Sequence, residues 1–223
     1  MATEKRTDFK EESAMMLLVE GLNDCHVVAA LCLLHQLPPK SFTIFDSGCE
    51  DKAIKKLSAR LDAAEGSIPL DKIAIVLDAD DDLNAKWQSV CHVLTKRGYT
   101  VPTQPHVNGT IISAEDKPTV GIWLMPNNQT NGMLEDFCQT LIDNQGVLDY
   151  VNQCITHAKQ QSYTTFKDVH LSKAVIHTYL AWQDEPAKPL GQAITAKVLN
   201  GHHPLAVTFK DWLEALFIAP ISS

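Results

Sequence analysis

The sequence has 223 residues, of which 45% are hydrophobic and 21% charged, values typical of a globular chain with enough apolar side chains for a sizeable core. Its formal charge of −8 argues against a protein that coats nucleic acid through a basic face. The charge does not exclude a nuclease, because an acidic metal site accounts for part of it. No apolar run approaches the ~20 residues that cross a bilayer, and the N-terminus lacks the charged-then-apolar pattern of a secretory signal. We therefore expect a cytoplasmic protein with no membrane contact.

The spacing of apolar residues predicts strands that alternate with helices. The predicted strands span residues 15–19, 42–45, 73–77 and 120–125. The predicted helices span residues 27–34, 54–61 and 83–94, and a further helix starts at Met133. Alternation of this kind is typical of crossover connections between parallel strands. The sequence therefore predicts an α/β, Rossmann-like fold with a mainly parallel sheet flanked by helices.

Two regions depart from this alternation. Within residues 98–118, Asn108-Gly109 lies between short apolar stretches and predicts a β-hairpin insertion with a type I′ turn. After residue 145 the apolar residues follow helical spacing only, as at Phe209, Trp212, Leu213, Leu216 and Phe217. We expect an α/β core over residues 14–145 and a C-terminal helical cap over residues 146–223 that packs on the core.

Acidic residues follow three of the four predicted core strands. Glu20 follows the first strand, with Asp24 four residues later, and Asp78, Asp80, Asp81 and Asp82 follow the third. Glu135 and Asp136 follow the fourth. Because ligands bind outside the carboxyl ends of parallel strands, we expect these carboxylates to share one edge of the sheet. Asp78 and Asp80, two residues apart, are expected to face one ion.

Such crowding has an electrostatic cost that a cation would remove. Two carboxylates about 4 Å apart repel by roughly 4 kcal/mol at an effective dielectric constant near 20. Oxygen ligands at an open site suit Mg²⁺ or Mn²⁺ better than zinc. The alternatives are structural: Asp24 and Glu135 suit the first turn of a helix, and residues 78–82 suit a solvated loop. A calcium loop of the EF-hand type is excluded, because Leu83 and Ser89 occupy the positions where it needs Gly and Glu.

Other catalytic signatures are absent from the sequence. It has no G-x-x-x-x-G-K-[ST] phosphate loop, no G-x-G-x-x-G dinucleotide fingerprint and no G-x-S-x-G nucleophile elbow. The six cysteines form no C-x-x-C pair, which argues against a zinc ribbon and favours reduced thiols.

Three stretches resemble the Toprim domain, the metal-binding fold of bacterial primases, topoisomerases and overcoming-lysogenisation-defect nucleases. They are LLVEGLND at residues 17–24, IVLDAD at residues 75–80 and GIWLMPNNQTNGMLEDF at residues 121–137. The chain is most similar to a small family of uncharacterised Toprim-like bacterial proteins. It lacks the ATPase partner domain of the lysogenisation-type enzymes, the zinc and polymerase modules of a primase and any recognisable strand-passage domain.

The resemblance implies roles for individual residues. Glu20 matches the glutamate that assists proton transfer or holds metal, and Asp24 completes the E-x-x-x-D arrangement of the nuclease branch. Asp78 and Asp80 match the D-x-D metal pair, Glu135 a later acidic ligand, and Asp82 an outer contributor. The nuclease branch also uses a basic residue near the site. The candidates for it are Lys173, Lys188 and Lys197.

The leading expectation is a phosphodiester-cleaving or phosphoryl-transfer protein that depends on Mg²⁺ or Mn²⁺ and acts on DNA or RNA. The alternative is a non-catalytic module that holds an ion or a basic partner at the same acidic edge. A homodimer is left open, because acidic proteins with hydrophobic caps often dimerise.

Overall fold

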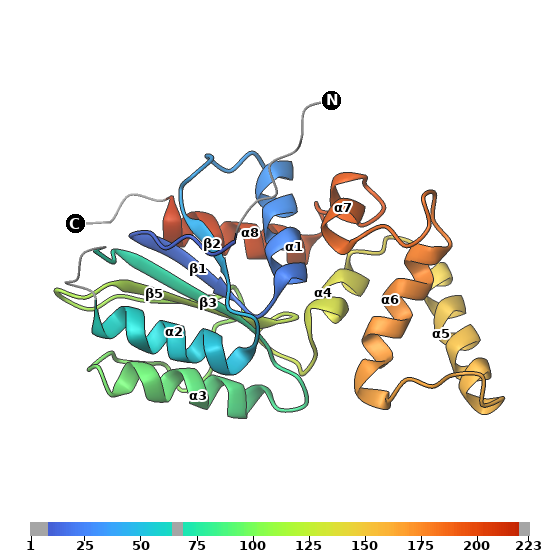
Figure 1. Ribbon diagram of the computed structural model, residues 1–223, viewed down its shortest axis with the longest axis horizontal. Helices are drawn as coiled ribbons and strands as arrows, with labels where there is room; N and C mark the ends of the chain where they lie inside the picture. Colours follow the sequence, from blue (N-terminus) through green and yellow to red (C-terminus); the bar gives the residue numbers. More distant parts are fainter. Residues whose placement is uncertain (1–8, 64–68, 219–223) are drawn as a thin grey trace.

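The computed structural model describes residues 9–63 and 69–218 and contains a five-stranded sheet between layers of helices (Figure 1). The strands are β1 (Met15–Val19), β2 (Thr43–Asp46), β3 (Lys72–Asp78), β4 (Thr110–Ile112) and β5 (Thr119–Met125). Their order across the sheet is β2-β1-β3-β5-β4, and only β4 runs antiparallel to its neighbour. The predicted α/β class with a mainly parallel sheet is confirmed.

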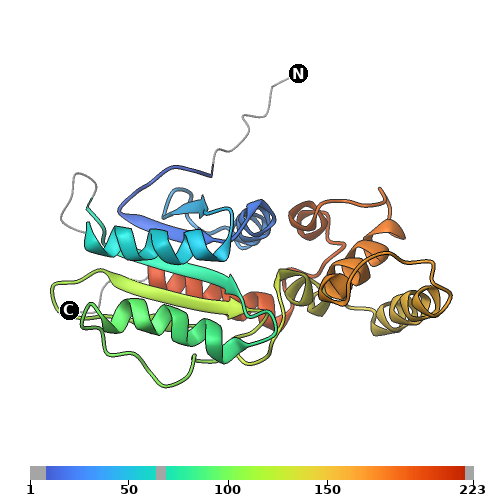
Figure 2. The ribbon, with the colours of Figure 1, turned by 60° about the horizontal axis from the view of Figure 1, so that its bottom comes forward.

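Side chains alternate between the two faces of the sheet, and each face has its own helical layer. Leu17 and Val19 of β1 belong to one hydrophobic cluster, whereas Met16 and Leu18 belong to the other. Helices α1 (Leu22–Leu34) and α8 (Pro204–Phe217) cover the first face, and α2 (Glu50–Asp62) and α3 (Leu83–Thr95) cover the second (Figures 1 and 2). Burial on both faces explains why the central strands read as nearly continuous apolar runs.

Helix α8 packs directly on β5 at Gly121, which has no side chain. A Cβ atom at Gly121 would stand 2.4 Å from Leu216 Cδ2 and 3.0 Å from Trp212 Cζ2. Beside this glycine, Trp123 packs against Phe209 of α8, with ring centroids 5.0 Å apart. The apolar stripe that predicted α8 from the sequence is therefore the face that lies on the sheet.

The structure does not confirm the predicted hairpin at Asn108-Gly109. A turn does form there, since the Gly109 N–H donates to the His106 carbonyl at 2.9 Å and Gly109 has φ +84°. However, only the segment after the turn is a strand, β4, and its antiparallel partner is β5. The physical reason is α8: a Cβ atom at Gly109 would stand 2.3 Å from Trp212 Cδ1, so the turn packs against a tryptophan rather than between two strands.

The remaining helices lie near the carboxyl end of the sheet. They are α4 (Leu134–Thr140), α5 (Gln145–Gln160), the 3-10 helix η1 (Asp168–His170), α6 (Leu171–Ala181) and α7 (Leu190–Thr195). Helices α5 and α6 pair with each other and project beyond the strand ends, and α6 also packs on α4 (Figures 1 and 2). We call residues 145–181 the helical arm.

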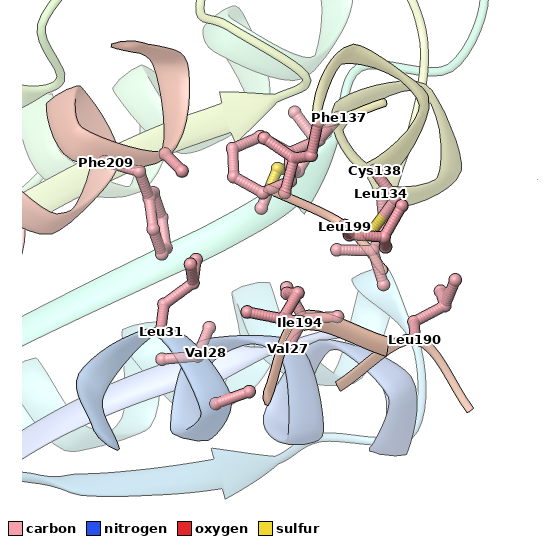
Figure 3. Packing of buried hydrophobic residues seen from close by; sticks show 14 of the residues in the cluster. Val27, Val28, Leu31, Leu134, Phe137, Cys138, Leu190, Ile194, Leu199 and Phe209 are labelled. Carbon is pink, nitrogen blue, oxygen red and sulfur yellow. The ribbon is translucent and has the colours of Figure 1, made fainter. Parts of the chain in front are cut away.

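Helices α7 and α8, by contrast, are part of the core. Figure 3 shows Ile194 of α7 and Phe209 of α8 facing Val27 and Leu31 of α1. At Gly191, a Cβ atom would stand 2.5 Å from the His26 carbonyl oxygen, so α7 and α1 approach each other closely. The C-terminal third of the chain therefore supplies both a projecting arm and two helices of the central core.

Within residues 9–63 and 69–218, every helix is too short or too polar to cross a membrane.

Candidate functional site

A cavity of about 420 Å³ opens at the carboxyl edge of the sheet. Four carboxylates and one ammonium group line it, together with residues 21–23 at the start of α1, residues 48–49 and Leu134. The charged lining residues are Glu20, Asp24, Asp78, Glu135 and Lys173. They come from the end of β1, the start of α1, the end of β3, the start of α4 and the helical arm. Segments far apart in the sequence thus meet around one space.

Glu20 and Asp78 meet because β1 and β3 are adjacent parallel strands. The Asp78 backbone N–H donates to Glu20 Oε1 at 2.8 Å. On its other side, the Leu134 N–H donates to Asp78 Oδ1, also at 2.8 Å. Asp78 therefore links the end of β1 to the start of α4. Because Glu135 follows Leu134 in α4, this link brings Glu135 to the cavity.

The two helix-borne carboxylates are the most deeply buried. Asp24, in the first turn of α1, is 8% exposed, and Glu135, in the first turn of α4, is 4% exposed. Among the described residues, the one ion pair of Glu135 is to Lys173, with Oε1 and Nζ 3.9 Å apart. Burial to this depth exceeds what a simple helix-start preference for acidic residues requires, because such residues are normally solvated.

Three of the carboxylates, Glu20, Asp24 and Asp78, have pKa values above those of free acids. Desolvation, reinforced by the charges of Asp24 and Glu20, raises the pKa of Asp78 to about 8. Desolvation and the neighbouring Glu20 raise the pKa of Asp24 to about 7, and burial also raises the pKa of Glu20. Like charges in a poorly solvated space disfavour joint ionisation, so the cavity favours the binding of protons or of a cation.

Asp80 does not line the cavity, and the expectation that Asp78 and Asp80 face one ion is not met in this structure. Asp80 has φ +48°, and its backbone forms two hydrogen bonds of 2.8 Å with Gly132. This left-handed backbone breaks the strand alternation, and the Asp80 carboxylate pairs with Lys86 Nζ at 2.8 Å. Lys86 also pairs with Glu50. Residue spacing alone could not indicate this ion pair between α2 and α3.

Asp82 has a structural contact instead of a place in the cavity. It is the N-cap of α3, and its Oδ1 accepts the Ala85 N–H at 2.9 Å. A carboxylate at this position stabilises the helix start by roughly 1 kcal/mol.

Of the three candidate lysines, the structure brings only Lys173 to the cavity. Lys188 pairs with Glu185, and Lys197 lies just after α7, outside the cavity lining. The sequence signal for Lys173 was slight: the stripe of Leu171, Val175 and Tyr179 leaves it off the apolar face of α6. Nothing in the spacing indicated that α6 would reach the carboxyl edge.

The chemistry of the lining fits a hard divalent cation. Its donors are carboxylate oxygens, the ligands that Mg²⁺ and Mn²⁺ prefer, and burial together with neighbouring carboxylates raises the pKa values of Asp24 and Asp78. Within the described ranges, no three His, Cys, Asp or Glu side chains already form a metal-binding group. The fit thus lies in the type and number of donors that face the cavity, not in a preformed ligand shell.

Together, fold and site define an α/β protein with a carboxylate-lined cavity outside the carboxyl ends of its parallel strands. A family model described as "Protein of unknown function (DUF3226)" matches residues 14–218, and the chain belongs to that family. No curated protein and no solved structure matches the chain significantly.

Proposed function

We propose that the protein uses Mg²⁺ or Mn²⁺ in this cavity for phosphoryl transfer, with cleavage of phosphodiester bonds in DNA or RNA as the reaction. The observation that carries the proposal is the convergence of four carboxylates and Lys173 on one cavity of about 420 Å³. The resemblance of three sequence stretches to the Toprim domain favours the same chemistry. A cytoplasmic location and a homodimer stay predictions from the sequence.

The chain's own residues divide the work in this proposal. Glu20, Asp78 and Glu135 hold the metal, which when bound neutralises phosphate oxygens and acidifies water. Asp24 exchanges a proton with the attacking water, because a carboxyl with a pKa of about 7 is close to the working pH of a general base. Glu20 can share this proton transfer. The Lys173 ammonium group orients the phosphate from the open side of the cavity.

Two of the predicted metal ligands act from outside the cavity. Asp80, held by Lys86, contributes negative charge that raises the pKa of Glu20. Asp82 holds the start of α3. In this proposal both support the site without entering it.

A cleavage assay tests the proposal. Wild-type protein is incubated with single-stranded DNA and with RNA, with Mg²⁺, Mn²⁺ or a chelator. Glu20→Gln and Asp78→Asn should each lower metal-dependent cleavage at least about 100-fold, because each removes a charged oxygen donor while keeping its shape. Asp81→Asn is the matched control: it lies in the same acidic run but is exposed and outside the cavity lining. Full cleavage by the cavity variants would refute the assignment.

A non-catalytic module that holds an ion or a basic partner is the second candidate. It is favoured by the excess of carboxylates over ammonium groups in the cavity lining, which suits an ion or a basic partner without requiring a reaction. In this case Mg²⁺ or Mn²⁺ should stabilise the wild-type fold, and the same variants should abolish the stabilisation, with no cleavage of either nucleic acid. The same protein samples therefore separate the two candidates.

A further inference from the structure

One exposed face of the helical arm carries a row of basic side chains. Lys167, His170, Lys173 and His177 follow one another at intervals of three or four residues through η1 and α6, and all four are exposed. Within α6, Lys173 and His177 are four residues apart and so lie on one side of the helix, while Lys167 and His170 precede it as the N-caps of η1 and α6. Asp168 is the one acidic residue between 167 and 181, and it pairs with Lys159 of α5. The segment therefore carries four basic side chains and one carboxylate, and Lys159 pairs with that carboxylate.

The row meets the acidic cavity at Lys173. Lys173 lines the cavity, and the start of α6 is fixed against α4 beside it. The Ser172 hydroxyl donates to Asp136 Oδ1 at 2.6 Å, and Gln139 Nε2 donates to the Ser172 carbonyl at 3.2 Å. These contacts hold the basic row in a defined position relative to the carboxylates.

The size of the cavity limits what can enter it. Cavities of roughly 300 to 1,000 Å³ hold single small molecules, and this one, at about 420 Å³, is at the lower end of that range. It admits about one nucleotide. A longer substrate must lie mostly outside it, where the formal charge of −8 repels phosphates unless basic side chains attract them locally.

We propose that the Lys167, His170, Lys173 and His177 face of the arm binds the phosphate backbone of a single nucleic-acid strand, one phosphate of which enters the acidic cavity. The lysines supply point charges and the imidazole rings of the histidines supply N–H donors. Both suit phosphate oxygens. The inference deepens the proposed function and rests on it, because it takes the cavity to be where the strand reacts. It specifies a single nucleic-acid strand as the substrate and this face of the arm as the path of that strand.

The test measures binding rather than cleavage. Fluorescence anisotropy follows a labelled oligothymidylate of about 12 nucleotides, with Ca²⁺ in place of Mg²⁺ to keep the strand intact. The double variant Lys167→Ala with Lys173→Ala should bind at least fivefold more weakly than wild type. The negative slope of log affinity against log salt concentration should also become shallower by about 1.4, at roughly 0.7 for each lost phosphate contact.

The matched control makes the same change of charge elsewhere. Lys55 of α2 and Lys96 after α3 are exposed and outside the cavity lining, so Lys55→Ala with Lys96→Ala should leave the affinity within about twofold of wild type. Equal weakening by both double variants would overturn the proposal, since it would show a non-specific charge effect. Competition by polyglutamate as effective as by the strand would also overturn it, in favour of an acidic peptide as partner.

Length dependence gives a second readout. Thymidine monophosphate reaches only the cavity, so Lys167→Ala should leave its affinity unchanged while weakening the longer strand. If Lys167→Ala weakened the binding of thymidine monophosphate and of the longer strand to the same extent, the proposed path of the strand along the arm would be overturned. A wild-type protein that binds the strand along this face but never cleaves it would contradict the proposed function alone.

Discussion

At the level of single residues, Asp78 organises the acidic cavity. Its backbone N–H holds Glu20 and its carboxylate holds the start of α4, yet the same carboxylate is crowded by Asp24 and Glu20. The residue that assembles the site therefore also destabilises it at neutral pH. Strain of this kind is expected where a ligand compensates for it.

The stability of the metal-free protein should accordingly fall as the pH rises. In the unfolded chain Asp24 and Asp78 lose their protons near the ordinary aspartate pKa of 3.8, but in the folded protein near about 7 and about 8. Between these values the folded state binds more protons, so each pH unit lowers the free energy of unfolding by up to about 1.4 kcal/mol per carboxyl. The contribution of these two carboxyls to stability should be greatest below about pH 4 and should level off above about pH 8. Urea unfolding at several pH values, in a chelator, measures this.

Asp78→Asn should flatten the pH profile and make the metal-free protein more stable than wild type at about pH 8. Asparagine keeps an oxygen for the Leu134 N–H but adds no charge. Asp81→Asn should follow the wild-type profile. A parallel profile for Asp78→Asn would mean that Asp78 ionises freely in the folded state.

The acidic residues of the cavity were accessible to sequence reasoning, whereas its cation was not. Glu20 and Asp78 directly follow the apolar runs of β1 and β3, so the rule for parallel strands places them at one edge. Lys173 depends on the docking of α6 against α4 through Ser172 and Asp136, a contact between segments 36 residues apart. Asp80 was misplaced because its left-handed backbone depends on the pairing with Gly132, which strand periodicity cannot reveal.

At the level of elements, the close approach of α8 to the sheet depends on glycine. Gly121 in β5 leaves room for Leu216, and Gly109 before β4 leaves room for Trp212. The sequence predicted α8 from its apolar stripe, and Asn108-Gly109 predicted a turn. The sequence could not show that Gly109 makes room for Trp212 of α8. Without that contact, Asn108-Gly109 was interpreted as the turn of a hairpin. Local patterns fix a helix or a turn, whereas the partner that packs on it is a tertiary property.

Gly121→Ala should destabilise the protein by about 1 to 3 kcal/mol, because an added methyl group overfills the contact between β5 and α8. Chemical denaturation with tryptophan fluorescence measures the change, since Trp212 and Trp123 lie at this contact. Gly146→Ala is the matched control. Gly146 is exposed in the first turn of α5, where alanine should be neutral or stabilise the helix by up to about 1 kcal/mol. Equal effects of the two substitutions would contradict the packing argument.

At the level of the whole molecule, the site joins two bodies of the structure. The carboxylates belong to the α/β core, whereas Lys173 belongs to the projecting arm (Figure 2). A divalent ion in the cavity would relieve the repulsion within the core and so raise the stability of the entire fold. The size of this effect depends on pH, because protons and metal compete for the same oxygens.

Mg²⁺ or Mn²⁺ at about ten times its dissociation constant should stabilise the wild-type protein by about 1.4 kcal/mol. For a chain of this size this corresponds to a rise of roughly 3 to 6 °C in Tm. At one fixed metal concentration, the rise should be larger at about pH 8 than at about pH 5.5, where Asp24 and Asp78 are mostly protonated and the dissociation constant is higher. Thermal denaturation with and without metal measures it. An identical rise in the double variant Glu20→Gln with Asp78→Asn would place the ion elsewhere.

The position of α8 in the sequence has a consequence for synthesis on the ribosome. The strands of the sheet emerge first, but one face of β5 is covered by a helix that is translated long after it. Until residues 204–217 have left the exit tunnel, the nascent chain exposes Trp123 and its apolar neighbours to water. A chaperone that binds exposed apolar surface on nascent chains therefore has a defined binding site on this protein. It can dissociate from that site only after α8 has emerged and packed on β5.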